Sequence, residues 1–263
     1  MPSKDRIILI LIIVLGLVGI VHAQDNEILD MLPIFESNDS INDTFDAEIN
    51  THLYAFYASA GDSVTIGMTQ DSDDLDPFLV LLDISGAVLA MDDDSGSVFL
   101  AAEITDFEIP ADNTYLILAT SLSFLEGTDS ASDELRYTVS VTGNVAPSDI
   151  DTNEVTLEAI GLDYGLVVEG ESADTTPATF FVFEGTQGDI VNVLVESDEF
   201  PTIIHVFSPA GDRLAVDPSA ITSLELPDDG LYLILATDVF FYEAMQEDSY
   251  FLGGAFTLSL NNS

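Results

Sequence analysis

The chain has 263 residues, of which 48 are Asp or Glu and 4 are Lys or Arg, so its formal net charge is −44. This imbalance excludes nucleic-acid binding through a phosphate-neutralising basic patch, and it equally excludes docking on anionic lipid headgroups. Hydrophobic residues make up 47% of the chain and aromatic residues 9%. Such a composition is typical of a folded globular protein and not of a disordered acidic chain.

Residues 1–23 have the pattern of a secretory signal peptide. Lys4 and Arg6 form a short positive segment, Ile7–Val21 is a nearly continuous apolar run, and Val21–Ala23 ends in the small residue that signal peptidases prefer. We expect cleavage before Gln24 and a secreted, extracellular or cell-surface protein. The alternative is a retained membrane anchor, for which about 15 apolar residues are short against the roughly 20 that a span needs. The sequence contains no Cys, which excludes disulfides and thiolate metal sites.

Four sequence blocks recur in the same order in the two halves of the chain. Each block of the first half has a matching block in the second half: Leu53–Ile66 matches Phe180–Val193, Leu81–Asp92 matches Val206–Asp217, Phe107–Thr120 matches Leu224–Thr237, and Tyr137–Val141 matches Phe256–Leu260. A duplicated unit of about 110–120 residues has the size of a domain and not of a solenoid repeat. The sequence therefore predicts one domain over residues 24–145, a linker over residues 146–154 and a second domain over residues 155–263.

Within each copy, apolar residues recur with the period of two that is typical of β-strands. Val64 and Ile66 alternate with Thr65, and Tyr137, Val139 and Val141 alternate with polar residues in the same way. Gly, Asp, Asn and Pro interrupt these segments every 8–12 residues, as in antiparallel sandwiches. The expected fold class is all-β, with two tandem, jelly-roll-like antiparallel β-sandwiches.

The order of these motifs resembles the bacterial pre-peptidase C-terminal (PPC) domain family. The resemblance rests on Tyr54–Ile66, Asp76–Asp83, Gly86–Asp94 and Pro110–Ile117 in the first copy. The second copy is a weaker match, since Phe200–Ile204 replaces the Asp-Pro-Phe-Leu segment and Asp217–Ser219 replaces the Asp triplet. The resemblance implies a small jelly-roll-like β-sandwich that is usually a non-catalytic appendage of secreted proteases, with Ca²⁺ binding in some relatives.

The sequence offers little catalytic chemistry. His52 and His205 are the histidines beyond the signal segment, they fall at non-equivalent positions of the repeat, and we expect both to be surface or partly buried strand residues. Gly61–Ser63 is similar to an esterase nucleophile block, but the second copy keeps the Gly-Asp turn without the Ser, and no matching base follows. Gly-x-Ser-x-Gly, His-Glu-x-x-His and phosphate-loop motifs are absent from the sequence. The prediction is that the protein is not an enzyme.

A concentrated acidic constellation occurs in the first copy. Its members flank the expected strand pair 78–83 and 87–91, and they are Asp71, Asp73, Asp74, Asp76, Asp92, Asp93 and Asp94. The residues before the first strand of a hairpin and after the second lie at the same end. Because Ca²⁺ takes six to eight oxygen ligands, convergent carboxylates here are a candidate Ca²⁺ site. The alternative is that these Asp residues occupy solvated turns.

Two functions follow from these features. The first is a secreted, non-catalytic binding or accessory protein that engages an extracellular polymer, a protein or the cell surface, with Ca²⁺ as a candidate cofactor. The second is a structural protein that associates with itself in a surface layer or filament. Neither requires nucleic acid or insertion into a membrane after signal cleavage. The sequence leaves the identity of the ligand open.

Overall fold

The computed structural model describes residues 32–45, 51–72, 75–121, 134–145, 159–173, 176–238 and 253–262, and every helix or strand assigned within these ranges is a β-strand. The expected signal peptide, the expected linker and the predicted ligands Asp73 and Asp74 lie outside them. Within the described ranges, no helix has the length and apolar character needed to cross a membrane.

The first half of the chain forms two antiparallel four-stranded sheets. Their orders are β2-β7-β4-β5 and β1-β8-β3-β6. The strands are β1 (Asp39–Phe45), β2 (Thr51–Ala58), β3 (Ser63–Gln70), β4 (Pro77–Asp83), β5 (Val88–Asp92), β6 (Ala102–Glu108), β7 (Asn113–Ser121) and β8 (Leu135–Gly143).

The second half forms a four-stranded sheet, β10-β17-β12-β15, and a five-stranded sheet, β14-β13-β16-β11-β9, in which β9 is parallel to β11 and the other pairs are antiparallel. The strands are β9 (Ala159–Gly161), β10 (Val167–Ser172), β11 (Thr179–Gly185), β12 (Ile190–Glu196), β13 (Thr202–Phe207), β14 (Arg213–Asp217), β15 (Ala220–Glu225), β16 (Gly230–Asp238) and β17 (Gly254–Asn262).

The two halves share their strand order and several local hydrogen bonds. Replacing β1 by β10 and β2–β8 by β11–β17 converts the order of each sheet of the first half into its counterpart, except that the second half adds β9 at the edge beside β11. The Tyr115 hydroxyl donates to the Ala111 carbonyl at 2.7 Å, and the Tyr232 hydroxyl donates to the Asp228 carbonyl at 2.7 Å. The expected all-β sandwich class is confirmed, and the shared order agrees with the predicted duplication.

Each half buries an apolar core between its two sheets. In the first half, Val64, Ile66 and Met68 of β3 point inward and alternate with Thr65, Gly67 and Thr69, as a strand with one covered face requires. The corresponding inward positions of β12 are Val191, Val193 and Val195. The outer sheets therefore have the period of two that the sequence predicts.

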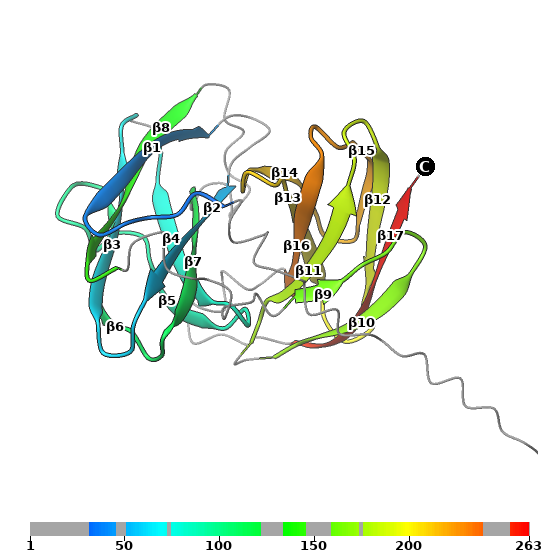
Figure 1. Cartoon of the computed structure of the whole chain (residues 1–263), viewed down its shortest axis with the longest axis horizontal. Helices are drawn as coiled ribbons and strands as arrows, with labels where there is room; N and C mark the ends of the chain where they lie inside the picture. Colours follow the sequence, from blue (N-terminus) through cyan, green and yellow to red (C-terminus); the bar gives the residue numbers. More distant parts are fainter. Residues whose placement is uncertain are drawn as a thin grey trace, which may run out of the picture.

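A third core lies between the two sandwiches, which stand side by side so that the four sheets form successive layers (Figure 1). It joins residues of β2, β4 and β7 to residues of β11, β13 and β16, including Leu53, Val80, Leu118, Phe207 and Leu235. The two inner sheets are thus covered on both faces. This third layer was not predicted, because a period of two indicates a strand with one covered face, whereas Leu53, Tyr54, Ala55 and Phe56 of β2 are all buried.

Two glycines let the backbones of the halves approach each other. Gly86, in the β4–β5 turn, has a φ of 86°, and a Cβ placed there would collide with the carbonyl of Ala178. Gly211, in the β13–β14 turn, has a φ of 88°, and a Cβ there would lie 2.7 Å from the Leu53 oxygen. These turns occupy equivalent places in the two halves, so each half packs its own turn against the other in a nearly two-fold arrangement.

Candidate functional site

The two predicted acidic stretches lie at one end of the first sandwich. Asp71 follows β3 and Asp76 precedes β4, while Asp92 ends β5 and Asp93 and Asp94 follow it. The loop after β5 is fastened to the end of β3, because Gln70 Nε2 donates to the Phe99 carbonyl at 3.1 Å. The chain thus brings both stretches to the same end of the sheets.

Two of the described carboxylates at this end accept hydrogen bonds from neighbouring parts of the chain. The Asp92 carboxylate accepts the Glu103 N–H at 2.7 Å, the Ser95 N–H at 3.0 Å and the Ser95 hydroxyl. The Thr138 hydroxyl donates to Asp71 Oδ2 at 3.0 Å. Across the described ranges, no group of three or more His, Asp or Glu side chains is arranged to hold a metal ion. Because Asp73 and Asp74 fall outside those ranges, the Ca²⁺ site stays a prediction.

Asp217 occupies in the second half the position that Asp92 occupies in the first half. It ends β14 as Asp92 ends β5, and it accepts the N–H groups of Ser219 and Ala220, each at 2.8 Å. These backbone hydrogen bonds hold the pKa of the Asp217 carboxyl below its ordinary value. An Asp at this point of the fold therefore fixes the turn that starts the next strand.

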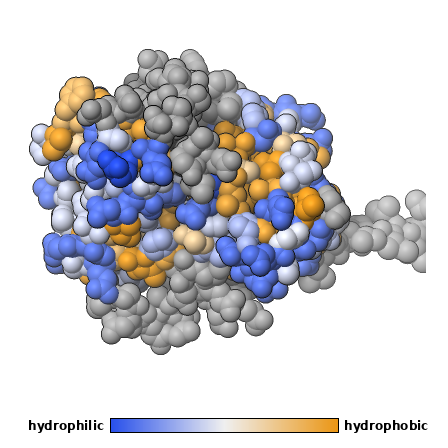
Figure 2. Space-filling model, turned by 90° about the horizontal axis from the view of Figure 1, so that it is seen from above, coloured by the Kyte–Doolittle hydropathy of each residue, from blue (hydrophilic) through white to orange (hydrophobic). Residues whose placement is uncertain are grey.

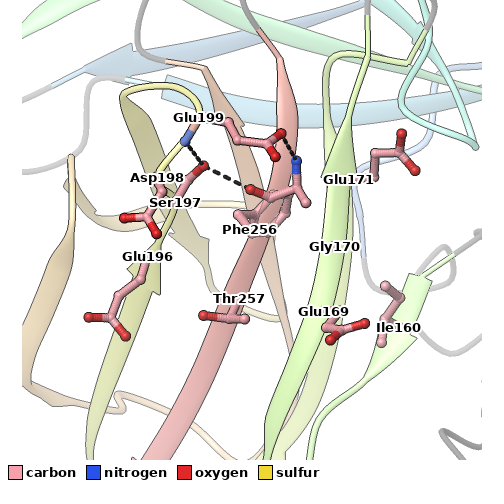
Figure 3. A pocket seen from close by; sticks show the side chains of 11 residues that line it. Ile160, Glu169, Gly170, Glu171, Glu196, Ser197, Asp198, Glu199, Phe256 and Thr257 are labelled. Carbon is pink, nitrogen blue, oxygen red and sulfur yellow. Dashed lines mark hydrogen bonds between the residues drawn. The ribbon is translucent and has the colours of Figure 1, made fainter.

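A groove of about 830 Å³ opens on the outer face of the second sandwich, and sequence reasoning missed it. Its floor is β17, and its walls come from β10 and from β12 with the loop that follows (Figure 3). Thr257 of β17 pairs with Glu169 on one side and with Glu196 on the other. Since paired residues of adjacent strands project from the same face about 4.8 Å apart, the two Glu side chains flank Thr257 about 10 Å from each other.

The lining of the groove is strongly acidic. Of the eleven described residues that line it, five carry carboxylates and none is Lys, Arg or His. The carboxylates are Glu169, Glu171, Glu196, Asp198 and Glu199. Figure 3 places Glu169 and Glu171 on one side of β17 and Glu196 and Asp198 on the other. Like charges gathered around a concave surface concentrate a negative potential there, which attracts cationic groups.

Glu199 and Ser197 fix the rim of the groove. Glu199 Oε2 accepts the Ala255 N–H at 2.9 Å, and the Ser197 hydroxyl donates to the Ala255 carbonyl at 2.8 Å. Gly254 is required beside them, because its φ is 140° and a Cβ there would collide with the Glu199 carboxylate. Under the floor, the ring of Phe256 covers Gly170, which leaves no room for a side chain at that position of β10. The groove is therefore held by side-chain hydrogen bonds to the β17 backbone on one wall and by packing of the Phe256 ring against Gly170 on the other.

Both histidines are buried, contrary to the expectation of surface or partly buried positions. His52 is 4% exposed and His205 is 1% exposed. The inner sheets that hold them are covered on both faces, which the local pattern did not reveal. Burial, and then the neighbouring Arg213 charge, place the pKa of His205 well below its ordinary value. His205 is therefore a neutral residue of the interior, with Arg213 Nη1 3.2 Å from its Nδ1.

No family model matches the sequence, and no curated protein matches it. Among solved structures, the chain is similar to the pre-peptidase C-terminal domain of a collagenase from Bacillus anthracis, with 15% identity, coverage of 42% of this chain and 94% of that chain, and a TM-score of 0.34. It is also similar to PliG of Aeromonas hydrophila, a periplasmic inhibitor of g-type lysozyme, with 15% identity, coverage of 43% and 96%, and a TM-score of 0.32. The human MASP-1/3 CUB1-EGF-CUB2 fragment aligns at 12% identity over 86% of this chain and 100% of that chain, with a TM-score of 0.23.

Proposed function

We propose that this protein is a secreted, non-catalytic binding protein that holds a positively charged segment of an extracellular partner protein in the groove along β17. The observation that carries the proposal is the pair of carboxylates, Glu169 and Glu196, that face each other across Thr257. A Lys or Arg side chain lying over Thr257 would meet a carboxylate on either side. Further cationic side chains would meet Glu171 and Asp198 along the same groove.

The shape of the groove favours an extended segment. Its floor follows β17, where the outward-facing residues Ala255, Thr257 and Ser259 have small side chains. Side chains of an extended chain that face the same way are spaced by two residues, as are Glu169 and Glu171 along β10. A basic segment lying parallel to β17 can therefore place successive cations against successive carboxylates.

The Ser197 hydroxyl on the rim of the groove supports a binding role over a catalytic one. A serine nucleophile needs a base that accepts its proton. The Ser197 hydroxyl instead donates to the Ala255 carbonyl and accepts the Glu199 N–H at 3.1 Å. Its proton is held by the backbone, and the groove lining offers no imidazole to take it.

The alternative, self-association through sheet edges, has less support. The edge strands β6 and β15 each face a register shift in the neighbouring strand, and each contains a residue with positive φ, Asp106 at 49° and Ser223 at 56°. Irregular edges twist away from a flat partner and so oppose edge-to-edge pairing. The high negative charge of every copy adds repulsion between copies.

The proposal is tested by titrating the protein with a short oligolysine peptide. We expect the double variant Glu169→Gln/Glu196→Gln to bind about fivefold to thirtyfold more weakly, since two exposed charge pairs contribute about 0.5–1 kcal/mol each. The matched control is Asp94→Asn/Glu108→Gln, which removes the same charge far from the groove and should stay within about twofold of the wild type. Equal losses in both double variants would show that only net charge attracts the peptide, and would refute the groove as the site.

A further inference from the structure

A polar cluster lies where the two sandwiches meet, and His52 is at its centre. His52 is the second residue of β2, and Nε2 of its ring lies 3.7 Å from Oδ1 of Asp212, which belongs to the other half of the chain. On the opposite side of the ring, Nδ1 contacts the Tyr137 hydroxyl and lies 3.3 Å from Asp43 Oδ2. Next to His52, the Leu53 N–H donates to the Gly211 carbonyl at 3.2 Å, so the backbones are also joined here.

Counting protons along this cluster assigns a hydrogen to Nδ1. The Tyr54 hydroxyl donates its single proton to Asp43 Oδ2 at 2.9 Å, because an ionised carboxylate only accepts. The 2.7 Å contact between Tyr54 and Tyr137 must then use the Tyr137 proton. The Tyr137 oxygen is left to accept from His52, which requires a proton on Nδ1. The contact between Nδ1 and Asp43 has the same requirement.

The other nitrogen faces a second carboxylate. Asp212 can only accept, so Nε2 also needs a proton if it is to be attracted to this group. With both nitrogens protonated, the ring is an imidazolium placed between Asp43 of one half and Asp212 of the other. We propose that His52 is doubly protonated in the folded protein and acts as a charged clamp between the two sandwiches, which loosens when the ring loses its second proton.

Among the groups of this cluster, His52 is the one whose charge changes with pH above the carboxylate range. Those that face it from the described elements are Asp43 on β1, Tyr54 on its own strand, Tyr137 on β8 and Asp212 in the β13–β14 turn. Burial raises the pKa of Tyr54 and of Tyr137 far above the ordinary tyrosine value, so both phenols keep their protons as the pH rises. Above the range in which carboxylates titrate, the imidazolium is the group of this cluster that changes charge.

The clamp exists on one side of the joint only. The position equivalent to His52 in the second half is Thr179, and the position equivalent to Asp212 in the first half is Ala87. Neither side chain ionises. The two halves therefore touch at two nearly equivalent places. The contact at His52 depends on the protonation of the ring, and the contact between Gly86 and Ala178 does not.

The first test is the ¹⁵N chemical shift of the His52 imidazole in the wild-type protein, which requires no variant to fold. We expect both ring nitrogens to give the shifts of protonated nitrogen at about pH 7, close above the ordinary His titration near 6.5. A ring with one protonated and one bare nitrogen at about pH 7 would overturn the proposal.

The second test is thermal unfolding as a function of pH. A proton that the folded state holds more tightly contributes stability at low pH and loses it as the pH rises through the titration of the folded protein. We expect Asp212→Asn to unfold about 2–4 °C below the wild type at about pH 6, with the gap closing by about pH 10. Asp94→Asn, an exposed substitution with the same change of charge, should show no such closing gap. A gap for Asp212→Asn that does not change with pH would refute the clamp.

Discussion

Replacing Leu118 by Ala removes a buried side chain from the core between the two sandwiches. Leu118 lies on β7, is 1% exposed and belongs to the apolar cluster that includes Phe207 and Leu235 of the other half. Large-to-small substitutions at fully buried leucines lower the free energy of unfolding by about 2–5 kcal/mol, because transfer and cavity terms add. If the halves were independent domains, Leu118 would face water and the same change would cost less than about 0.5 kcal/mol.

The assay is urea unfolding followed by far-ultraviolet circular dichroism, since the chain contains no Trp to report by fluorescence. Leu166→Ala is the matched control, because Leu166 is 48% exposed and the chemical change is identical. We expect a loss of about 2–5 kcal/mol at Leu118 and a loss within about 0.5 kcal/mol at Leu166. Equal and small effects at both sites would refute the shared core, and with it the rigid joint on which the His52 clamp depends.

Three further predictions concern single positions. Gly86→Ala should lower the melting temperature of the protein more than Gly61→Ala does. Both glycines have a φ near 85°, but only the Cβ at Gly86 would collide with the backbone of another segment. Equal melting temperatures of the two variants would contradict the close approach between the halves. Asp217→Asn should lower the free energy of unfolding at neutral pH, and the difference from the wild type should vanish as the pH falls through the titration of Asp217. The reason is that a carboxyl with a lowered pKa stabilises the fold only at a pH above that pKa. Acid unfolding of the two proteins checks this, and a difference that does not depend on pH would contradict it. If the acidic end of the first sandwich holds Ca²⁺, Ca²⁺ should raise the melting temperature relative to chelator, and Asp94→Asn should reduce that shift; the absence of any shift would remove the site.

The fold class could be predicted from the sequence because it depends on local patterns. The alternation at Val64 and Ile66 specifies a strand with one covered face, and Gly61 with Asp62 specifies a turn. The third layer left a weaker signal, the continuous apolar run Phe78–Leu82, which indicates a strand covered on both faces. That pattern does not indicate which part of the chain covers the second face of the strand. The burial of His52 and His205 depended on the same unseen layer.

The groove could not be predicted because it depends on strand register. Glu169, Glu196 and Thr257 are far apart in the sequence and stand in one row only because β17 lies between β10 and β12. In a chain with 48 acidic residues, no single Glu is distinctive. The acidic stretches around Asp71 and Asp92 were conspicuous in the sequence, whereas in the structure Asp92 accepts hydrogen bonds from Ser95 of its own loop and from the Glu103 N–H on β6.

The most direct test of the proposed function is amide NMR of the protein during titration with a short oligolysine peptide. We expect the chemical-shift changes to gather on Glu169, Glu196, Thr257 and their neighbours along β10, β12 and β17 (Figure 3). Hydrophilic side chains also cover much of the face seen in Figure 2, and the chain carries 48 acidic residues, so its acidic surface offers many competing places for weak attraction. Changes spread evenly over that acidic surface, or centred on the end of the first sandwich near Asp71 and Asp92, would contradict the groove as the binding site.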